Sequence, residues 1–410
     1  MAWPQMRLKH LARLTAGGTP PVGDARCWAV AGGIPWVAIS DMSNRAEVTT
    51  TARQVTPAGV AAARLTVAPA GTLLFSVYAS IGHAAVLGRA AAWNQAILGI
   101  TPTDPGTDTR FLRYALLATR ERLPAQARGT TQDNLTAELV RNLLLPHPDP
   151  ATQRRVADAL DAATADLDAL ARSHARELAL VDDRTRTHLV AALDRPGGEG
   201  RRVPVKHLFE PERAGAWGAD PDGGPDDVLC VRVADFDRRT LTAGAAATTH
   251  RRLTPDQLRT RALRPGDVLL ERSGGGGKTP VGFAVSYDGP PGTRATTSNF
   301  VSILRPRPHV HPRYAALLLA ARYHAGRTAA HTKQTTGIQN LDSSAYLSAA
   351  AHVPPAAAQA RTAAEVDERL TAAAAHRTAT ERQLALIAER RHTLIATAVT
   401  GALDLSTARP

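Results

Sequence analysis

The sequence has little of what disulfide, metal or membrane chemistry requires. Cys27 and Cys230 are its only cysteines, too few for a disulfide framework or a cysteine-rich zinc cluster. Its 14 histidines show no metal-ligand spacing. There is no run of 18 apolar residues, and the N-terminal MAWPQMRLKHL lacks the apolar stretch of a signal peptide. These absences predict a cytoplasmic protein with no metal site, no membrane contact and no cofactor of its own.

Catalytic motifs are also missing. The sequence has no DPPY-type adenine methylation motif and no paired acidic residues of the PD…ExK nuclease type. The stretch SGGGGKTP at 273–280 is similar to a phosphate-binding loop, but the pattern G-x-x-x-x-G-K-[ST] needs a glycine where Arg272 stands. Its flanks, RPGDVLLERS and VGFAVSY, alternate like strands, whereas such a loop opens a helix. We predict a hairpin tip and no catalysis; a basic loop whose Lys278 contacts phosphates is a second interpretation.

Positive charge is in excess. The 49 Lys and Arg residues outnumber the 37 Asp and Glu residues, which gives a net charge of +12 and favours an anionic partner, nucleic acid first. Only four of the 49 are Lys, so part of this excess reflects a general preference for arginine codons. Where the charge lies is therefore more informative than its total.

The sequence contains an internal repeat, in which six segments recur in the same order. The pairs are RLKHLARL (7–14) with PVKHLFEP (204–211), IPWVAISDMS (34–43) with DVLCVRVADFD (227–237), VAPAGTLLFS (67–76) with LRPGDVLLER (263–272), WNQAILGITP (93–102) with SNFVSILRP (298–306), RGTTQDNLTAELV (128–140) with KQTTGIQNLDSSAY (333–346), and LLPHPDPATQRRVADAL (144–160) with AHVPPAAAQARTAAEVD (351–367). Six ordered pairs indicate a duplicated unit rather than chance similarity.

Each copy combines a globular part with a long helix. The globular parts have short apolar runs between Gly- and Pro-rich turns, and one helical stretch each, FLRYALLAT and RYAALLLAARYH. At 410 residues, more than one domain is expected. We predict an α+β chain with two tandem mixed α/β domains at 1–150 and 196–355, and long helices at 151–195 and 356–405.

The two long helices are predicted to pair as an antiparallel coiled coil, in a chain with pseudo-two-fold symmetry. Neither stretch has an internal proline, and apolar residues recur with the 4-3 spacing of a coiled-coil seam. The predicted seam positions are Val156, Leu160, Ala163, Leu167, Leu170, His174, Val181 and Thr185 in the first helix, and Val366, Leu370, Ala373, Arg377, Thr380, Leu384, Ile387, Arg391 and Leu394 in the second.

The helices do not carry the excess charge. Residues 151–194 hold six Arg and eight acidic residues, and residues 356–405 hold six of each, so the rest of the chain carries +14. A codon preference alone would spread arginine evenly, so this distribution favours anion binding by the globular domains. Duplex DNA suits two such domains, because related domains can meet two major-groove segments of one duplex. Since the copies have diverged, we expect a bipartite, asymmetric target whose unread spacer is set by the helix length.

With these motifs in place, the chain resembles the specificity subunit of a type I restriction–modification system. The likeness rests on LARLTAGGTP, IPWVAISD, GTLLFS, IGHAAVLG, WNQA, TTQDNL and PHPDPATQRRVADAL in the first copy, and on GDVLLERSGGGG, VGFAV, TTGIQNL and VPPAAAQ in the second. It implies that each globular part is a target recognition domain and that the helices dock two methyltransferase (modification) subunits. Motor–nuclease (restriction) subunits would join that complex, and S-adenosylmethionine, ATP and Mg²⁺ would belong to these partners.

Candidate DNA-binding residues are the polar side chains at the predicted hairpin tips and repeated motifs, because Arg, Lys, Asn, Gln, Ser and Thr read base edges. In the first copy they are Ser80, His83, Asn94, Gln95, Thr130, Thr131, Gln132 and Asn134. In the second they are Arg272, Ser273, Gly275, Lys278, Thr297, Ser298, Asn299, Lys333, Gln334, Thr335 and Thr336.

Some of these residues also have a structural interpretation. Asparagine recurs at matching places of the two copies, at Asn94 and Asn299 and at Asn134 and Asn340. Residues that read different half-sites should differ between the copies. Recurrence therefore favours a role in turns or in phosphate contacts. Asp41 and Asp235 also recur, and a turn or capping role is expected for both. His174 is expected to pack in the seam, and Trp28, Trp36 and Trp93 to lie in the core.

Three other functions stay open at this point. The chain could be a coiled-coil scaffold with two protein-binding domains, or a specificity subunit of another methylation-based phage defence system. A nucleotide-hydrolysing enzyme would rest on SGGGGKTP alone.

Overall fold

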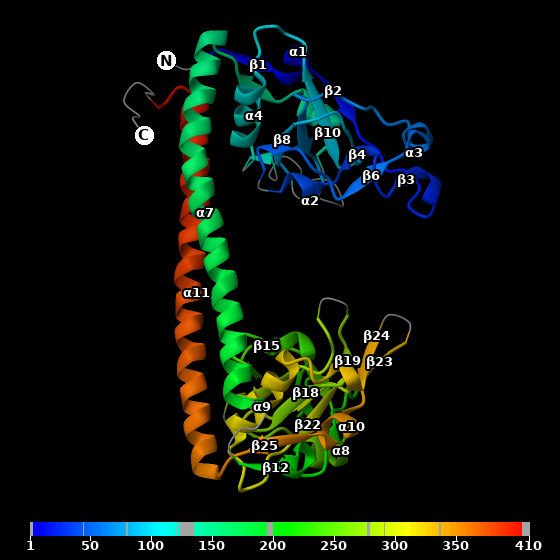
Figure 1. The fold of residues 1–410 in the computed structure, drawn as a ribbon, viewed down its shortest axis with the longest axis vertical. Helices are drawn as coiled ribbons and strands as arrows, with labels where there is room; N and C mark the ends of the chain where they lie inside the picture. Colours follow the sequence, from blue (N-terminus) through cyan, green and yellow to red (C-terminus); the bar gives the residue numbers. More distant parts are fainter. Residues whose placement is uncertain are drawn as a thin grey trace. The chain divides into compact units, whose positions relative to one another are not determined.

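The computed structural model divides by its contacts into two compact units. Unit 1 comprises residues 1–173 and 383–410, and unit 2 comprises residues 174–382. The structure describes residues 3–43, 45–78, 81–120, 122–123, 135–194, 200–276, 279–290, 292–335 and 338–403. In these parts of the chain, no helix is both long enough and apolar enough to cross a membrane. Figure 1 shows both units as mixed α/β structures.

The globular part of unit 1 is built on two sheets. The larger has the strand order β2 (Ala12–Ala16), β10 (Ile97–Pro102), β7 (Leu73–Ser76), β8 (Ala84–Leu87), β5 (Glu47–Val48). The smaller has the order β3 (Trp28–Ala29), β6 (Arg53–Val55), β4 (Ile34–Val37), β9 (Ala92–Trp93), and β1 (Gln5–Arg7) pairs with β11 (Leu144–Pro146). The shorter helices are α1 (Leu8–Leu11), α2 (Ile39–Met42), α3 (Pro57–Ala62), α4 (Thr109–Ala118) and α6 (Ala137–Arg141).

Unit 2 repeats this plan. Its larger sheet has the order β13 (Arg213–Ala214), β22 (Val301–Leu304), β18 (Val268–Glu271), β20 (Ala284–Tyr287), β16 (Thr242–Ala243), β15 (Phe236–Asp237). Its smaller sheet has the order β17 (His250–Arg252), β14 (Asp227–Val231), β21 (Ala295–Thr297), and β12 (Arg201–Pro204) pairs with β25 (Ala350–Val353). A further sheet joins β19 (Ser273–Gly274), β24 (Ile338–Leu341) and β23 (Thr332–Thr335), and the shorter helices are α8 (Pro255–Arg261), α9 (Pro312–His324) and α10 (Ser343–Ser348).

The strand pairings confirm the duplication inferred from the sequence. In both units, the hairpin at the centre of the larger sheet is antiparallel (β7 with β8, β18 with β20), and the next strand joins in parallel (β5 on β8, β16 on β20). The smaller sheets also agree, because β4 pairs in parallel with β9 and β14 pairs in parallel with β21. Five strands of each larger sheet therefore follow one topology at an offset in sequence.

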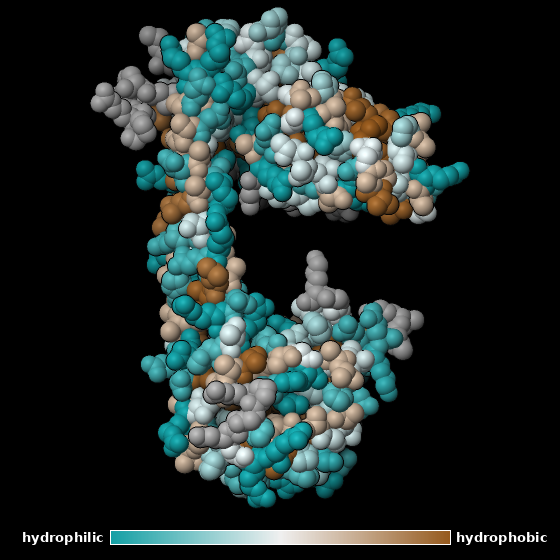
Figure 2. All heavy atoms as spheres, in the orientation of Figure 1, coloured by the Kyte–Doolittle hydropathy of each residue, from teal (hydrophilic) through white to brown (hydrophobic). Residues whose placement is uncertain are grey.

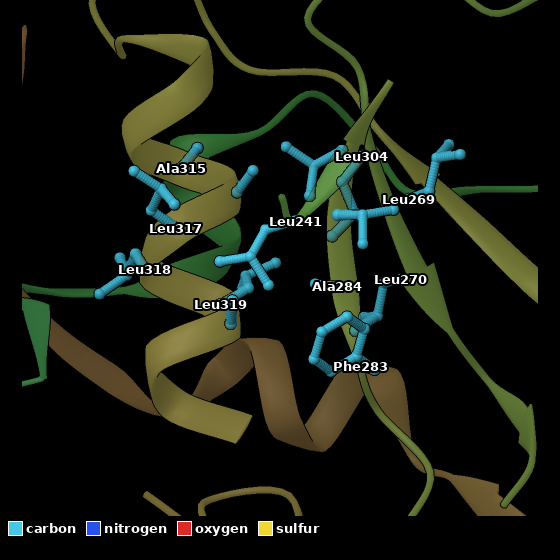
Figure 3. Packing of buried hydrophobic residues seen from close by; sticks show 14 of the residues in the cluster. Leu241, Leu269, Leu270, Phe283, Ala284, Leu304, Ala315, Leu317, Leu318 and Leu319 are labelled. Atoms are coloured by element: carbon cyan, nitrogen blue, oxygen red, sulfur yellow. The ribbon is translucent and has the colours of Figure 1, made fainter. Parts of the chain in front are cut away.

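Buried helices and strands form the core of each unit. In unit 2, α9 begins at Pro312, a favoured first helical residue, and every residue from Tyr314 to Arg322 is buried. Figure 3 shows its alanine and leucine side chains beside those of β18 and β20, with Leu241 between them. In unit 1, α4 fills the corresponding place, and the Asp108 carboxylate caps its first turn by accepting from the N–H groups of Arg110 and Phe111. The predicted helical stretches are thus confirmed.

Two long helices contribute to both units. They are α7 (Pro150–Leu193) and α11 (Ala356–Val399), each of 44 residues. In unit 1, Asp168 of α7 accepts a 2.9 Å hydrogen bond from Arg391 of α11, and in unit 2 Asp182 of α7 pairs with Arg377 of α11. Within unit 2 the helices run in opposite directions, because Glu177 lies beside His376 while the later Leu189 lies near the earlier Leu370.

The predicted seam needs one correction. All nine predicted positions of α11 are buried or half-buried. In α7, however, Ala163 is exposed and Leu170 is 47 % exposed, so these two predictions are wrong. Thr164 is buried in place of Ala163, because its hydroxyl donates to the Leu160 carbonyl and contacts the Tyr114 hydroxyl of α4. Tertiary packing here outweighs the apolar pattern.

Candidate nucleic-acid interface

Three segments meet at one end of unit 2: the loop between β18 and β20, the turn between β21 and β22, and the β23–β24 hairpin. The N–H of Arg272, in the loop, donates to the carbonyl of Phe300, in the turn, at 2.8 Å. The N–H of Leu341, in the hairpin, donates to the Arg272 carbonyl at the same distance. Arg272 therefore joins the regions that hold the sequence-predicted residues of the second copy.

The hairpin presents one face to solvent. Strand β24 pairs with β19 on one side and with β23 on the other, which places Ser273 and Lys333 opposite Asn340. Side chains alternate along a strand, so Ile338 lies on the same face as Asn340. We call Ser273, Lys333, Ile338 and Asn340 the hairpin face. Figure 1 shows the three strands side by side, and the visible surface beside them in Figure 2 is largely hydrophilic.

The hairpin face carries groups that can recognise bases. The Ser273 hydroxyl donates to Asn340 Oδ1 at 2.7 Å, so the carboxamide nitrogen of Asn340 points away from that bond. The Lys333 side chain is 81 % exposed, and its Nζ lies 4.0 Å from Asp342. Ile338 is 54 % exposed and offers an apolar surface. Asn and Lys suit the edges of adenine and guanine, and an apolar side chain suits the methyl group of thymine.

The opposite side of the hairpin positions the glycine loop. Gln339 Oε1 accepts a 3.1 Å hydrogen bond from the N–H of Val281, and Gln334 lies across the hairpin from Gln339. Gly275 has φ +65°, and a Cβ there would lie 2.7 Å from the Val281 nitrogen, so only glycine fits. Of the predicted candidates here, Lys278, Thr336 and the side chain of Thr335 lie outside the described residues.

The glycine-rich stretch is a hairpin connection, as predicted. It follows β18, forms the short strand β19 and leads into β20, which pairs antiparallel with β18. The loop of a nucleotide hydrolase instead opens a helix, whose N-terminal N–H groups face the phosphates. No helix follows this loop in the described chain, since the next element is β20. This geometry does not support the nucleotide-hydrolase alternative.

A buried acidic residue lies beneath the loop. Glu271 ends β18, its side chain is only 2 % exposed, and burial raises the pKa of its carboxyl group. Glu271 Oε2 accepts from the N–H of Phe283 at 3.4 Å and lies 3.7 Å from the Arg238 guanidinium, which opposes that rise. Arg238 also stacks 4.2 Å above the Phe283 ring. Arg238 and Glu271 thus support the base of the loop from within the domain.

The turn between β21 and β22 divides the remaining candidates. Thr297 is fully buried, and its hydroxyl donates to the Val231 carbonyl at 2.7 Å. Ser298 is 4 % exposed, and its N–H donates to the same carbonyl. Asn299 and Phe300 are exposed at the tip of the turn. Thr297 and Ser298 are therefore part of the framework, whereas Asn299 can reach a ligand.

Unit 1 holds the corresponding segments with the same backbone bonds. The N–H of Val77 donates to the Ala96 carbonyl at 2.9 Å, and the N–H of Leu135 donates to the Val77 carbonyl at 3.0 Å. Val77 thus occupies the position that Arg272 has in unit 2. The predicted candidates Ser80, Thr130, Thr131, Gln132 and Asn134 lie outside the described residues.

The described candidates of unit 1 lie at this end of the domain. His83 is half-buried, and its Nε2 lies 3.1 Å from the Arg120 guanidinium; burial and then this charge lower its pKa. Gln95 is exposed, and its Oε1 accepts a hydrogen bond from the Thr19 hydroxyl. Asn94 caps its own turn, because its Oδ1 accepts from the N–H of Ala96 at 3.1 Å. The exposed Gln95 can therefore face a ligand, whereas His83 packs against Arg120 and Asn94 shapes the turn.

One predicted correspondence is wrong. Asn94 and Asn299 are not equivalent, because the N–H of Asn94 donates to Val37 and the N–H of Ser298 donates to Val231, at matching positions of β4 and β14. Asn94 therefore corresponds to Ser298, and Gln95 to Asn299. Aligning the two sequences on their shared asparagine shifts this motif by one residue from the correspondence seen in the structure.

The structure confirms the capping roles expected for Asp41 and Asp235. Asp41 accepts from the N–H of Ala38 at 2.9 Å, and Asp235 accepts from the N–H of Arg232 at 2.8 Å, so both carboxylates cap short turns. Trp36 and Trp93 are buried, whereas Trp28 is only partly buried, with the Arg53 guanidinium 3.4 Å above its ring. His174 is mostly shielded and contacts Glu177. No group of three or more metal-ligating residues gathers in the described chain.

Sequence reasoning missed Ile338 and Phe300 as surface residues, and gave Asn340 only a structural role. Ile338 and Asn340 lie two residues apart on a short exposed strand, and that alternation in GIQNL is the signal that could have identified them. Phe300, 53 % exposed, stands where unit 1 has Ala96. An apolar residue at a turn carries no sequence signal of exposure.

The chain is similar to known proteins in sequence and in fold. Residues 2–177 match the family model of the type I restriction modification DNA specificity domain. Over 163 residues the chain is 28 % identical to the specificity subunit of the type I restriction enzyme MjaIX from Methanocaldococcus jannaschii, which covers 38 % of this chain. That match spans only 37 % of the relative's length. Both matches support the resemblance inferred from the sequence for the first copy.

Solved structures extend the likeness in fold. A chain solved in a study of complex assembly and conformational transition of the type I R-M system is 17 % identical, with 98 % of both chains covered and a TM-score of 0.68. The HsdS subunit of Thermoanaerobacter tengcongensis is also 17 % identical, over 98 % of this chain and 97 % of that chain, with a TM-score of 0.45. The first match shows that almost the whole chain has the fold of that structure.

Proposed function

We propose that the chain is the DNA-binding specificity subunit of a type I restriction–modification complex. Each globular domain reads one half of a bipartite, asymmetric duplex target. The observation that carries this proposal is that both units build the same loop assembly on one framework and then place different side chains on it. Arg272 and Phe300 in unit 2 stand where Val77 and Ala96 stand in unit 1. A shared framework with divergent tips is what reading two different half-sites requires.

The proposed domain boundaries follow from the same division of roles. Residues 1–150 and 196–355 are the target recognition domains, and residues 151–195 and 356–405 are the helical spacers. The helices dock two methyltransferase subunits, and restriction subunits join that complex. Leu180 of α7, 69 % exposed, and Leu386 of α11, 57 % exposed, support such docking, because they place large apolar side chains on helix surfaces outside the seam.

A selection from random duplex DNA tests the proposal. The chain is purified with its co-expressed methyltransferase partner, and bound duplexes are sequenced. We expect a split motif with two unlike halves and a fixed unread gap. Salt-sensitive binding without any enriched motif would contradict the proposal and leave a basic scaffold. Binding with a shallow salt dependence would point to protein partners instead, since phosphate contacts force a steep one.

A further inference from the structure

A cavity of about 350 Å³ lies in unit 2, where α7 and α11 meet the segment that follows β15. Four arginines line it: Arg186 from α7, Arg238 and Arg239 after β15, and Arg377 from α11. Asp182 is the only acidic residue in its lining, and it is engaged by Arg377. The lining itself therefore holds more basic than acidic side chains.

Each of the other guanidinium groups has an acidic partner outside the cavity lining, and Arg238 lies 3.7 Å from the buried Glu271. Arg239 pairs with Glu381 at 3.1 Å, and both side chains are roughly half exposed. Arg186 pairs with Asp183 at 3.5 Å on an exposed stretch of α7. Exposed pairs of this kind contribute at most about 1 kcal/mol, so an anion can displace them. The arginines already act on a neighbour: burial, together with the charges of Arg186 and Arg238, lowers the pKa of His324 to about 4.

Small side chains create the space. Thr185 of α7 and Ala374 of α11 line the cavity. Gln153 and Gln359 hold matching positions at the starts of the two helices, which gives an offset of 206 residues. At that offset Thr185 corresponds to Arg391 and Ala374 to Asp168, which bind each other at 2.9 Å in unit 1. At these two positions unit 1 has an ion pair, whereas unit 2 has small side chains and forms its ion pair at Asp182 and Arg377 beside them.

A chain of contacts within unit 2 links the cavity to the β23–β24 hairpin. Arg238 lines the cavity and contacts Glu271 and Phe283, the residues that border the glycine loop. That loop is bonded in turn to the hairpin through Gln339. Figure 1 shows β15, β19 and β24 toward the same end of unit 2. A strand whose bases met the hairpin face could thus pass its backbone over the arginines.

We propose that this cavity binds a phosphate group of the DNA whose bases face the hairpin face. The proposal rests on the function proposed above and adds a site for which no base contact is needed. A phosphate contact positions the protein on the duplex without carrying sequence information. The cavity residues should therefore control affinity and its salt dependence, whereas the hairpin face should control sequence preference. Free pyrophosphate shares the phosphate chemistry and serves as the probe for a site of small anions.

The test uses the full chain with its methyltransferase partner and the double variant Arg186→Gln/Arg239→Gln. We expect binding to the selected duplex to weaken about fivefold per lost phosphate contact at 0.15 M salt, and the slope of log K against log salt to fall by about one. The selected motif should stay the same. The matched control is Arg259→Gln, which removes an exposed arginine of α8 in the same unit and should change neither quantity.

Methylphosphonate substitution locates the contact. Neutral linkages are introduced one at a time along the selected duplex, and one position should weaken the wild type but not the double variant. An unchanged salt slope in a folded double variant would overturn the cavity proposal, as would a methylphosphonate profile that the variant does not alter. Pyrophosphate binding that the variant abolishes, without any effect on DNA, would also overturn it and assign the site to small anions. If the wild type selects no motif, the proposed function itself fails, a result distinct from all of these.

Discussion

In unit 1 the N–H of His83 donates to the Ser76 hydroxyl at 2.9 Å, and in unit 2 the N–H of Phe283 donates to the Glu271 carboxylate at 3.4 Å. At matching positions, each side chain accepts a backbone hydrogen bond that closes the loop after the central strand. Ser76 does so as a small hydroxyl, whereas Glu271 is a buried acid that brings Arg238 with it. The comparison teaches that the two copies keep their backbone connections while the side chains that make them diverge.

Exchange of a whole recognition domain should change the selected DNA motif more than any other alteration of the chain. Replacing residues 204–350 with the same segment of a relative of different specificity should change one half of the selected motif completely and leave the other half intact. The reason is that the framework bonds, which are conserved between the units, are mostly backbone bonds. Sequencing of selected duplexes measures the result. A change in both halves would show that the units do not read independently.

Insertions in the long helices should come next. A matched insertion of seven residues in α7 and α11 keeps a 3.5-residue seam in register and adds about 10 Å of helix, which is about three base pairs of duplex. We expect the same two half-sites with a correspondingly longer gap. Four residues added near position 175 of α7 alone should lengthen the gap or abolish binding, because the seam would lose its register. An unchanged gap after the matched insertion would refute control of spacing by the helices.

Single substitutions on the hairpin face should alter one base position. Asn340→Ala should weaken binding to the preferred site by about 1–3 kcal/mol and relax the preference at one position of one half-site. Gln334→Ala, on the opposite side of the same hairpin, is the matched control and should leave the motif unchanged. Competition binding with single-base variants of the site measures both. A uniform loss over all variants would instead make Asn340 a phosphate contact.

Two buried glutamines hold matching positions in the two units, so replacing each should lower the stability of the protein by a similar amount. Gln153→Ala and Gln359→Ala should each lower the free energy of unfolding by about 2–3 kcal/mol, because each leaves buried backbone groups without partners. Both side chains are at most 2 % exposed. Gln383→Ala, at an exposed position of α11, is the control and should change stability by less than about 0.5 kcal/mol. Urea unfolding monitored by circular dichroism measures all three, and unequal losses would break the equivalence.

The smallest expected effect concerns Glu271. Because its folded-state pKa is raised above the ordinary value of 4.5, its contribution to stability is present below that value and is lost as the pH rises through the folded-state pKa. Glu271→Gln should therefore lose less stability than the wild type between pH 4.5 and pH 7, measured by urea unfolding across that range. Ser76→Ala, at the matching position of unit 1, should leave the pH dependence unchanged. Parallel pH profiles for Glu271→Gln and the wild type would contradict the prediction.

The sequence predicted the parts of the fold that have a periodic or repeated pattern. The two domains, the long helices and the hairpins at the glycine loop follow from apolar periodicity and from six recurring motifs. It could not place Thr164 in the seam, because that position is set by the Tyr114 hydroxyl on another helix. It could not separate Thr297, buried beneath Val231, from Asn299 at the surface, because the two are only two residues apart in one motif. Exposure at a turn depends on what packs below it.

One glutamine amide contributes only backbone contacts to the joint between each globular part and its long helix. In unit 1, Gln153 accepts from the N–H of Asp108 at 2.9 Å and donates to the carbonyls of Gly106 and Pro148. In unit 2, Gln359 accepts from the N–H of His311 at 2.9 Å and donates to the carbonyl of Pro354. All of these partners are backbone atoms, so the glutamine places no demand on the side chains of the domain it holds, unlike the neighbouring pairs of Arg110 with Asp158 and of Arg313 with Asp367. A foreign domain that kept this backbone path would therefore find the same hydrogen-bond partner on the helix, whatever side chains its loops carried.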